Sequence, residues 1–252
     1  MDLFFMCIML SFSGIFTKYV YIEDEKNWQD ALTYCRQQYT DLAPVSNEQD
    51  NLKLQQLSGI LSSTSWPCIW IGAERNCSNR EQWLWSGGGV PTTCFWSPGE
   101  PNDFLGVEDS GCLQKNGWND ANAQDNKTFF CYHAVVVEEE KTWEEALEYC
   151  REHHDDLASV ASETEMLLIQ RELKKHNSTE HVWIGLHFFS LVGQAGWLWV
   201  DRQEMDYEAW DEGWKPTCPD QRMECAAIQV TEGTEGVWGA HDCEEKLNFV
   251  CY

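Results

Sequence analysis

Acidic and amide side chains gather in one stretch of the chain, SPGEPNDFLGVEDSG at 97–111. Within it, Glu100, Asn102 and Glu108 offer carboxylate and amide oxygens, and Asn119 and Asp120 follow shortly afterwards. Carboxylates crowded together repel one another unless a cation lies between them. Ca²⁺ takes roughly six to eight oxygen ligands of this kind. The pattern predicts a calcium site; for the Glu-Pro-Asn segment alone the alternative is a surface turn, because proline and asparagine are turn formers.

The whole chain is strongly acidic. It has 252 residues, a formal net charge of -25 and fourteen tryptophans. The charge argues against nucleic acid or an anionic membrane as a partner, because both require basic surface. The length suits two domains of about 100–120 residues each.

The first residues predict a secretory signal. The apolar run at 3–10 is too short to span a bilayer, which takes about 20 residues. Ser11 and Ser13 are small residues spaced like a signal-peptidase site, so we expect a signal at 1–17 cleaved near Ser13. No lysine or arginine precedes the run, and a buried strand is the alternative. No other segment is apolar enough to cross a membrane, so we expect a secreted, extracellular protein.

Sequons and cysteines agree with secretion. Asparagine–x–serine/threonine sequons at Asn76, Asn126 and Asn177 predict glycosylation. Of twelve cysteines, Cys7 leaves with the signal and eleven remain, for which disulfides are expected in an oxidising compartment. Zinc is disfavoured because no close Cys-x-x-Cys pair occurs. Since eleven is odd, at least one thiol is expected to be free or intermolecular.

An internal repeat organises the chain. WQDALTYCRQQYTDLAPVS at 28–46 matches WEEALEYCREHHDDLASVA at 143–161, and matching WIG, WLW and closing FFCY/NFVCY segments follow in the same order. The period is near 115 residues, which predicts two domains, 18–132 and 133–252, rather than a solenoid. No Gly/Ser/Pro linker separates them, so we expect tight coupling.

Each repeat predicts the same elements. An extended segment precedes an amphipathic helix, whose apolar residues fall at i, i+3, i+4 and i+7: Trp28, Ala31, Leu32 and Cys35. A second helix is expected after Ser46 or Ser162, and Ser162 with Glu165 predicts a capping box. Short tryptophan-rich strands and a long irregular middle follow. The predicted fold is α+β, with two helices, short antiparallel sheets and a long structured loop in each domain.

These features resemble C-type lectin-like domains, in tandem as in mannose-receptor-like proteins, over nearly all of 19–252. The resemblance implies that Glu-Pro-Asn, a glutamate six residues beyond its asparagine and Trp-Asn-Asp form a sugar-binding calcium site. The implied calcium ligands are Glu100, Asn102, Glu108, Asn119 and Asp120, of which the first four also contact sugar. It further implies a cis peptide bond before Pro101 and mannose, N-acetylglucosamine or fucose as ligands.

The resemblance extends partly to an auxiliary calcium site. Asp103 and Asp109 match part of it, and its remaining ligands are expected in AERNCSNRE at 73–81, where Glu74 or Glu81 could serve. In the second repeat, alignment on Gly213 places Trp214-Lys215-Pro216 and Trp238-Gly239-Ala240 at the ligand positions. We therefore expect the second domain to have lost the site and to serve as a spacer, a protein-binding surface or a dimer contact.

The resemblance implies three disulfides: Cys35–Cys131, Cys150–Cys251 and Cys225–Cys243. The family's partner for Cys112 is missing, because Ala123 stands there. One arrangement of the remaining cysteines pairs Cys77 with Cys94 and Cys68 with Cys112, and leaves Cys218 as the free thiol. Spacing alone does not decide this.

Two other classes of function compete with a lectin. A glycosidase would use paired carboxylates, but it needs one carboxylate held protonated in a low-dielectric pocket. The cluster His153-His154-Asp155-Asp156 is interpreted as a solvated helix end rather than a catalytic base, so we do not expect an enzyme. A calcium-independent protein-interaction module of the same fold is the second alternative. One active domain per chain favours oligomers or clustered glycans for useful avidity.

Overall fold

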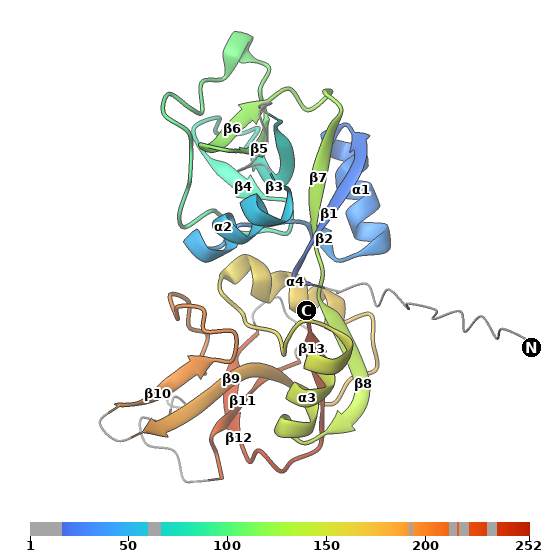
Figure 1. The fold of residues 1–252 in the computed structure, drawn as a ribbon, viewed down its shortest axis with the longest axis vertical. Coiled ribbons are helices and arrows are strands. Elements are labelled where there is room, and N and C mark those ends of the chain that lie inside the picture. Colours follow the sequence, from blue (N-terminus) through green and yellow to red (C-terminus); the bar gives the residue numbers. More distant parts are fainter. Residues whose placement is uncertain (1–16, 60–66, 192–193, 212–215, 217–221, 231–235) are drawn as a thin grey trace, which may run out of the picture.

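Two α+β units lie in tandem in the computed structural model, as predicted (Figure 1). It describes residues 17–59, 67–191, 194–211, 216, 222–230 and 236–252. The predicted cleavage at Ser13 and the thiol of Cys218 lie outside these ranges. Among the described residues, no helix is long and apolar enough to cross a membrane.

In its described residues, the first unit contains two α-helices and a seven-stranded sheet. Its elements are β1 (Tyr19–Lys26), α1 (Trp28–Gln38), β2 (Asp41–Leu42), α2 (Glu48–Leu57), β3 (Ile69–Arg75), β4 (Trp83–Trp85), the 3-10 turn η1 (Phe104–Gly106), β5 (Ser110–Gln114), β6 (Gly117–Ala121) and β7 (Lys127–Tyr132). The order is β1-β7-β3-β5-β6, with β2 on β7 and β4 on β3. The β3–β7 pair is parallel, so the sheet is not purely antiparallel.

Where the structure describes it, the second unit repeats the plan with two helices and a six-stranded sheet. Its elements are β8 (Val135–Lys141), α3 (Trp143–His153), α4 (Glu163–Leu173), β9 (His181–Leu191), β10 (Gln194–Trp199), β11 (Cys225–Gln229), β12 (Trp238–His241) and β13 (Leu247–Cys251). The order is β12-β11-β9-β13-β8, with β10 on β9 and a parallel β9–β13 pair.

Buried tryptophans tie the helices to the sheets in the same way twice. The indole N–H of Trp28 donates to the carbonyl of Ile71 at 3.0 Å, and that of Trp143 donates to the carbonyl of Ile184 at 2.9 Å. Disulfides reinforce each contact: Cys35–Cys131 joins α1 to β7, and Cys150–Cys251 joins α3 to β13. The repeated sequence thus encodes the same helix-on-sheet packing in both units.

One helix cap differs from the sequence-based prediction. The predicted capping box at Ser162 is only half formed: Ser162 accepts the Glu165 N–H, but the Glu165 carboxylate accepts the N–H of Ala161 instead of the cap N–H. A complete box occurs at Thr142 and Glu145, at the start of α3. Glu165 is diverted because it takes part in a contact between the units.

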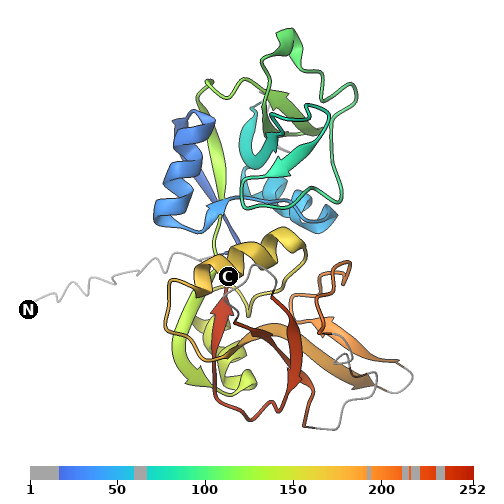
Figure 2. The ribbon, with the colours of Figure 1, turned by 180° about the vertical axis from the view of Figure 1, so that it is seen from behind.

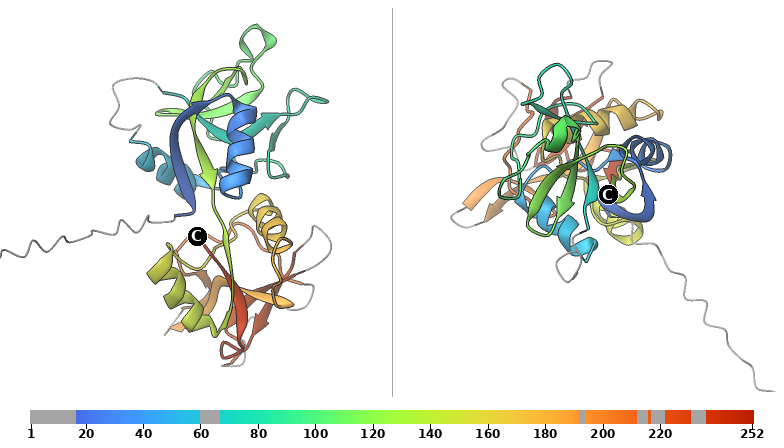
Figure 3. Two further views of the ribbon diagram at one scale, coloured as in Figure 1. Left: turned by 90° about the vertical axis from the view of Figure 1, so that its right-hand side faces the viewer. Right: turned by 90° about the horizontal axis from the view of Figure 1, so that it is seen from above.

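The two units share one buried interface, into which α2 and α4 project from opposite sides (Figure 2). Strand β7 runs on to β8 with two residues between them (Figure 3). The phenols of Tyr132 and Tyr252 meet at 3.2 Å, and Arg171 of α4 donates to Asp41 at 2.9 Å. This agrees with the tight coupling expected from the missing linker.

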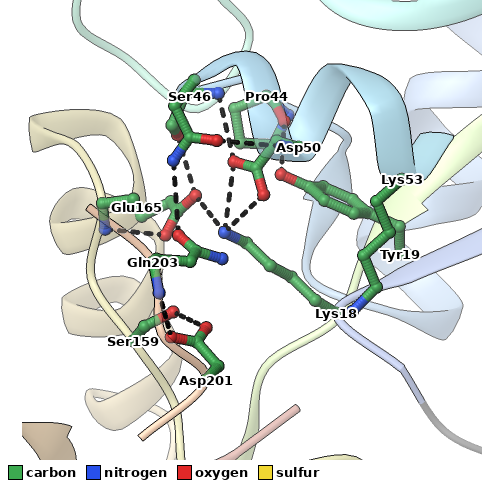
Figure 4. A network of polar contacts seen from close by, with 12 residues as sticks. Lys18, Tyr19, Pro44, Ser46, Asp50, Lys53, Ser159, Glu165, Asp201 and Gln203 are labelled. Carbon is green, nitrogen blue, oxygen red and sulfur yellow. Dashed lines mark hydrogen bonds and ion pairs between the residues drawn. The ribbon is translucent and has the colours of Figure 1, made fainter. Parts of the chain in front are cut away.

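A buried lysine lies at the centre of this interface (Figure 4). The Lys18 ammonium is 3.0 Å from Asp50 of α2 and 2.8 Å from Glu165 of α4, and all three side chains are buried. Ser46 donates to Glu165 at 2.8 Å and lies 2.9 Å from the hydroxyl of Ser162. Because buried charges need partners, this network couples the two units electrostatically.

Candidate functional site

The predicted ligands lie at the end of the first unit that is farthest from the second, where a long loop meets the β5–β6 hairpin (Figure 1). Trp118 anchors this end: it is fully buried and its indole N–H donates to Asn51 at 3.0 Å. Its backbone N–H donates to Phe95, and its carbonyl accepts from Ser97 at 2.8 Å. Asn119 and Asp120 are therefore held beside the loop.

Asp120 is the organising side chain of the site. It is fully buried, and Oδ1 accepts the backbone N–H of Asn102 at 3.0 Å while Oδ2 accepts that of Asp103 at 2.8 Å. A carboxylate from β6 thus fixes the backbone of the Glu-Pro-Asn segment. The Glu100–Pro101 bond is cis, as the resemblance implies.

The other predicted ligands converge on the same loop. The Asn102 amide donates to Glu100 Oε2 at 2.6 Å, and Glu108 Oε2 accepts the N–H of Phe104 at 2.8 Å. The Asn119 amide donates to the carbonyl of Asp120. The five predicted ligands therefore lie on one loop and one strand: Glu100, Asn102, Glu108, Asn119 and Asp120.

The site is electrostatically crowded. The pKa of Glu100 is raised above its usual value, first by burial, then by hydrogen bonding to Asp120 and by the negative charge of Asp120. Glu108 adds to the same effect. A carboxylate whose pKa is raised by neighbouring negative charge is stabilised by a cation.

This donor set fits calcium. It consists of carboxylate and amide oxygens, the hard ligands that calcium takes, and it contains no sulfur or imidazole. Glu100, Asn102, Glu108, Asn119 and Asp120 would hold the ion.

Two arginines, which the sequence analysis missed, lie against the site. Arg75 ends β3 and its Nη2 donates to Asp120 Oδ2 at 2.5 Å. Arg80 contacts both carboxylate oxygens of Asp103, at 2.9 and 2.8 Å, and Asp109 at 2.9 Å. Both arginines stand in AERNCSNRE, where auxiliary calcium ligands were expected, and their charge was the available signal.

Of the acidic residues named for the auxiliary site, Asp103 and Asp109 are brought together by Arg80, whereas Glu74 and Glu81 have other neighbours. Asp103 and Asp109 both pair with Arg80, and the guanidinium of Arg80 lowers the pKa of Asp103. Burial is the main cause of the raised pKa of Glu74; the charge of Arg36 opposes this shift and that of Asp41 adds to it. Glu81 is exposed, and its N–H donates to Asn79.

The cysteines near the site follow half of the suggested arrangement. Cys68 and Cys112 form a disulfide, and Cys225 and Cys243 form another in the second unit. The suggested Cys77–Cys94 bridge is wrong: both thiols are free and exposed. Cys77 lies in a surface turn in which Asn76 accepts the N–H of Ser78, and this turn is stabilised without a bridge.

The second unit anchors the equivalent loop without the ligands. Trp238 is fully buried, donates its N–H to Ala209 at 2.8 Å and accepts from Asp211 at 3.3 Å, as Trp118 does with its own loop. Gly239 and Ala240, which follow in β12, carry no side-chain oxygen. The predicted positions Trp214 and Lys215 lie outside the described residues.

The remaining predicted features lie on the surface. His153 ends α3 and stacks on Tyr149, while Asp155 pairs with Lys53 of the first unit at 3.0 Å and Asp156 with Arg151 at 3.1 Å. These ion pairs agree with a helix end rather than a catalytic base. The sequon asparagines Asn126 and Asn177 are exposed and Asn76 is partly exposed, so all three are accessible.

The sequence profile of the Lectin C-type domain matches the chain twice, at residues 24–133 and 139–252. The chain belongs to the C-type lectin domain family. Its two units are therefore called the first and second domains below.

Two of the curated relatives are much longer than this chain. The chain is 24% identical to human Lymphocyte antigen 75 over 89% of its own length and 14% of that protein. It is also 24% identical to C-type mannose receptor 2 of Rattus norvegicus, over 89% of the chain and 17% of the receptor. The chain thus spans less than a fifth of either relative. Human lithostathine, a solved structure, matches 46% of the chain and 89% of its own length at 24% identity, with a TM-score of 0.41.

Proposed function

We propose that the first domain binds carbohydrate in a calcium-dependent manner, with mannose, N-acetylglucosamine or fucose-type glycans as ligands. The observation that carries this proposal is that the oxygen-bearing side chains of Glu100, Asn102, Glu108 and Asn119 lie on the loop and the strand that the buried carboxylate of Asp120 holds together. The raised pKa of Glu100 supports it, because crowded carboxylates favour a bound cation. The relative named as a mannose receptor agrees in class.

Each side chain of the proposed site has its own role in binding the ion or the sugar. When bound, calcium would supply coordination positions for two neighbouring sugar hydroxyls. Glu100 and Glu108 accept hydrogen bonds from sugar hydroxyls with their carboxylates, while Asn102 and Asn119 donate amide N–H hydrogen bonds to sugar oxygens. Asp120 orients the loop through the N–H groups of Asn102 and Asp103, and is too buried to contact sugar directly.

Several further properties belong to this proposal. We infer a signal at 1–17, secretion, domains at 18–132 and 133–252, and glycans at Asn76, Asn126 and Asn177. We infer binding rather than catalysis, because five converging oxygen ligands suit an ion better than an acid–base pair. The second domain has no ligand set at β12, so a protein partner or a second copy of the chain is its proposed contact.

The test is retention of the full chain on immobilised mannose. The wild type should be retained in millimolar calcium and released by chelator, whereas Glu100→Ala should pass through at every calcium concentration. Glu23→Ala is the control, because Glu23 is an exposed residue on β1. Retention of Glu100→Ala, or of the wild type in chelator, would favour the calcium-independent protein-interaction module.

A further inference from the structure

Arg75 is buried among the atoms that shape the loop. Its side chain is only 7% exposed. Nε donates to the carbonyl of Glu108 at 3.0 Å, Nη1 to the carbonyl of Arg80 at 2.7 Å and Nη2 to Asp120 at 2.5 Å. The guanidinium also lies 4.6 Å from the centre of the Trp83 ring. One cation thus joins β3, the 76–82 turn, the loop and β6.

Arg80 completes the arrangement from outside. It bridges Asp103 and Asp109, which lie on either side of the loop tip. Asp103 Oδ1 in turn accepts the N–H of Glu108 at 3.3 Å. One guanidinium therefore links the two ends of the 103–109 segment.

The second domain shows that Arg75 is not required by the fold. In the WIG-containing repeat, Phe188 stands where Arg75 stands, since IWIGAER at 69–75 matches VWIGLHF at 182–188. The backbone N–H of each residue donates at 2.8 Å to the carbonyl just before the next strand of the sheet, Arg75 to Asp109 before β5 and Phe188 to Glu224 before β11. Phe188 also packs on Trp197, as Arg75 does on Trp83. The position of Arg75 therefore carries an arginine only in the first domain, which is also the domain that has the loop carboxylates.

We propose that Arg75 and Arg80 take the place of a second metal ion and hold the 102–109 loop in shape without one. A guanidinium is permanently protonated and binds carboxylates with two parallel hydrogen bonds. Asp103 and the Glu108 carbonyl already accept hydrogen bonds from these guanidinium groups, and Asp109 is ion-paired with Arg80 at 2.9 Å. A second calcium ion has no free ligand set here, so the expected stoichiometry is one ion per chain.

A loop that is held before the ion arrives is preorganised. Among the five proposed ligands of the first ion, the arginine side chains contact only one side-chain oxygen, Asp120 Oδ2. They act as positioning residues for the proposed sugar site. The role of the arginines in the loop does not depend on the proposed function. The expected count of one ion per chain does, because that ion is the proposed sugar-site calcium.

Hydrogen exchange in chelator tests it. In the full-length wild type, the N–H groups of Asn102, Asp103 and Glu108 should be protected in excess chelator, because Asp120 and Asp103 accept them. Arg80→Gln should speed exchange across 102–109 by about tenfold or more. Arg80→Lys, which keeps the charge, should restore part of the protection.

Two measurements accompany the exchange experiment. Arg151→Gln is the matched control, because Arg151 is similarly exposed and pairs with Asp156 in the second domain. It should leave exchange at 102–109 unchanged. Calcium titration should give one ion per wild-type chain.

The outcomes separate the two proposals. Two ions per chain, or unprotected 102–109 amides in chelator, would overturn the role of the arginines while leaving calcium-dependent sugar binding intact. No calcium binding together with an Arg80-dependent loop would uphold the arginine role and refute the proposed function.

Discussion

Replacing Lys18 with methionine should destabilise the chain by about 3–5 kcal/mol, the typical effect of removing one partner from a buried ion pair. The substitution leaves the carboxylates of Asp50 and Glu165, which lie within 3.0 Å of the ammonium, buried without their cation. Burial already raises the pKa of Glu165, and the charge of Lys18 is what opposes this shift. Because the residues come from both domains, both should be affected.

The assay is urea unfolding followed by tryptophan fluorescence and far-ultraviolet circular dichroism. The triple variant Lys18→Met/Asp50→Asn/Glu165→Gln should recover much of the loss, since no buried charge remains. The deficit of Lys18→Met should also be larger at pH 8 than at pH 5. A carboxyl whose folded pKa is raised costs stability once the unfolded form ionises, and this cost disappears when both forms are protonated.

A surface pair provides the comparison. Lys53→Met breaks the exposed Lys53–Asp155 contact between the domains and should cost less than about 1 kcal/mol. If Lys18→Met cost no more than Lys53→Met, or if the triple variant were less stable than Lys18→Met, the electrostatic account of the interface would be wrong.

Two further predictions concern titrating groups away from the sugar site. Burial, and then the charge of His154, lowers the pKa of His133 to about 4; the folded chain should therefore lose stability as pH falls from 6.5 towards 4, and His133→Gln should flatten the thermal-unfolding profile over that window. Cys94 is exposed as a residue, but partial burial of its sulfur raises the pKa of the thiol. Iodoacetamide at pH 7.5 should therefore label Cys77 faster than Cys94 by peptide mass spectrometry; equal or reversed rates would contradict this.

The repeat made much of the fold predictable. Trp28 and Trp143 begin equivalent helices, and each indole donates to the carbonyl of the isoleucine in the WIG strand of its own domain. Such packing follows from local periodicity and from residues that recur in step, which a sequence displays directly. The predicted ligands are similarly gathered, because Trp118 fixes the strand that carries Asn119 and Asp120.

The contacts that the sequence did not reveal are those between charges far apart in the chain. Lys18 meets Glu165 across 147 positions (165 − 18), and no local pattern predicts that pairing. Arg75 and Arg80 stand in the 73–81 segment, but only its acidic residues match calcium ligands, so the segment predicts a metal site and not two arginines bound to carboxylates. The Cys77–Cys94 suggestion failed because spacing does not determine cysteine pairing.

The most direct test of the central claim is a calorimetric calcium titration of the full chain in chelator-cleared buffer. The account predicts one site per chain with a Kd of about 10⁻⁴–10⁻³ M, as in extracellular calcium modules. Glu100→Ala should abolish that site, while Glu23→Ala should leave it unchanged. A folded wild-type chain that takes up no calcium, or a Glu100→Ala variant that binds as the wild type does, would contradict the account.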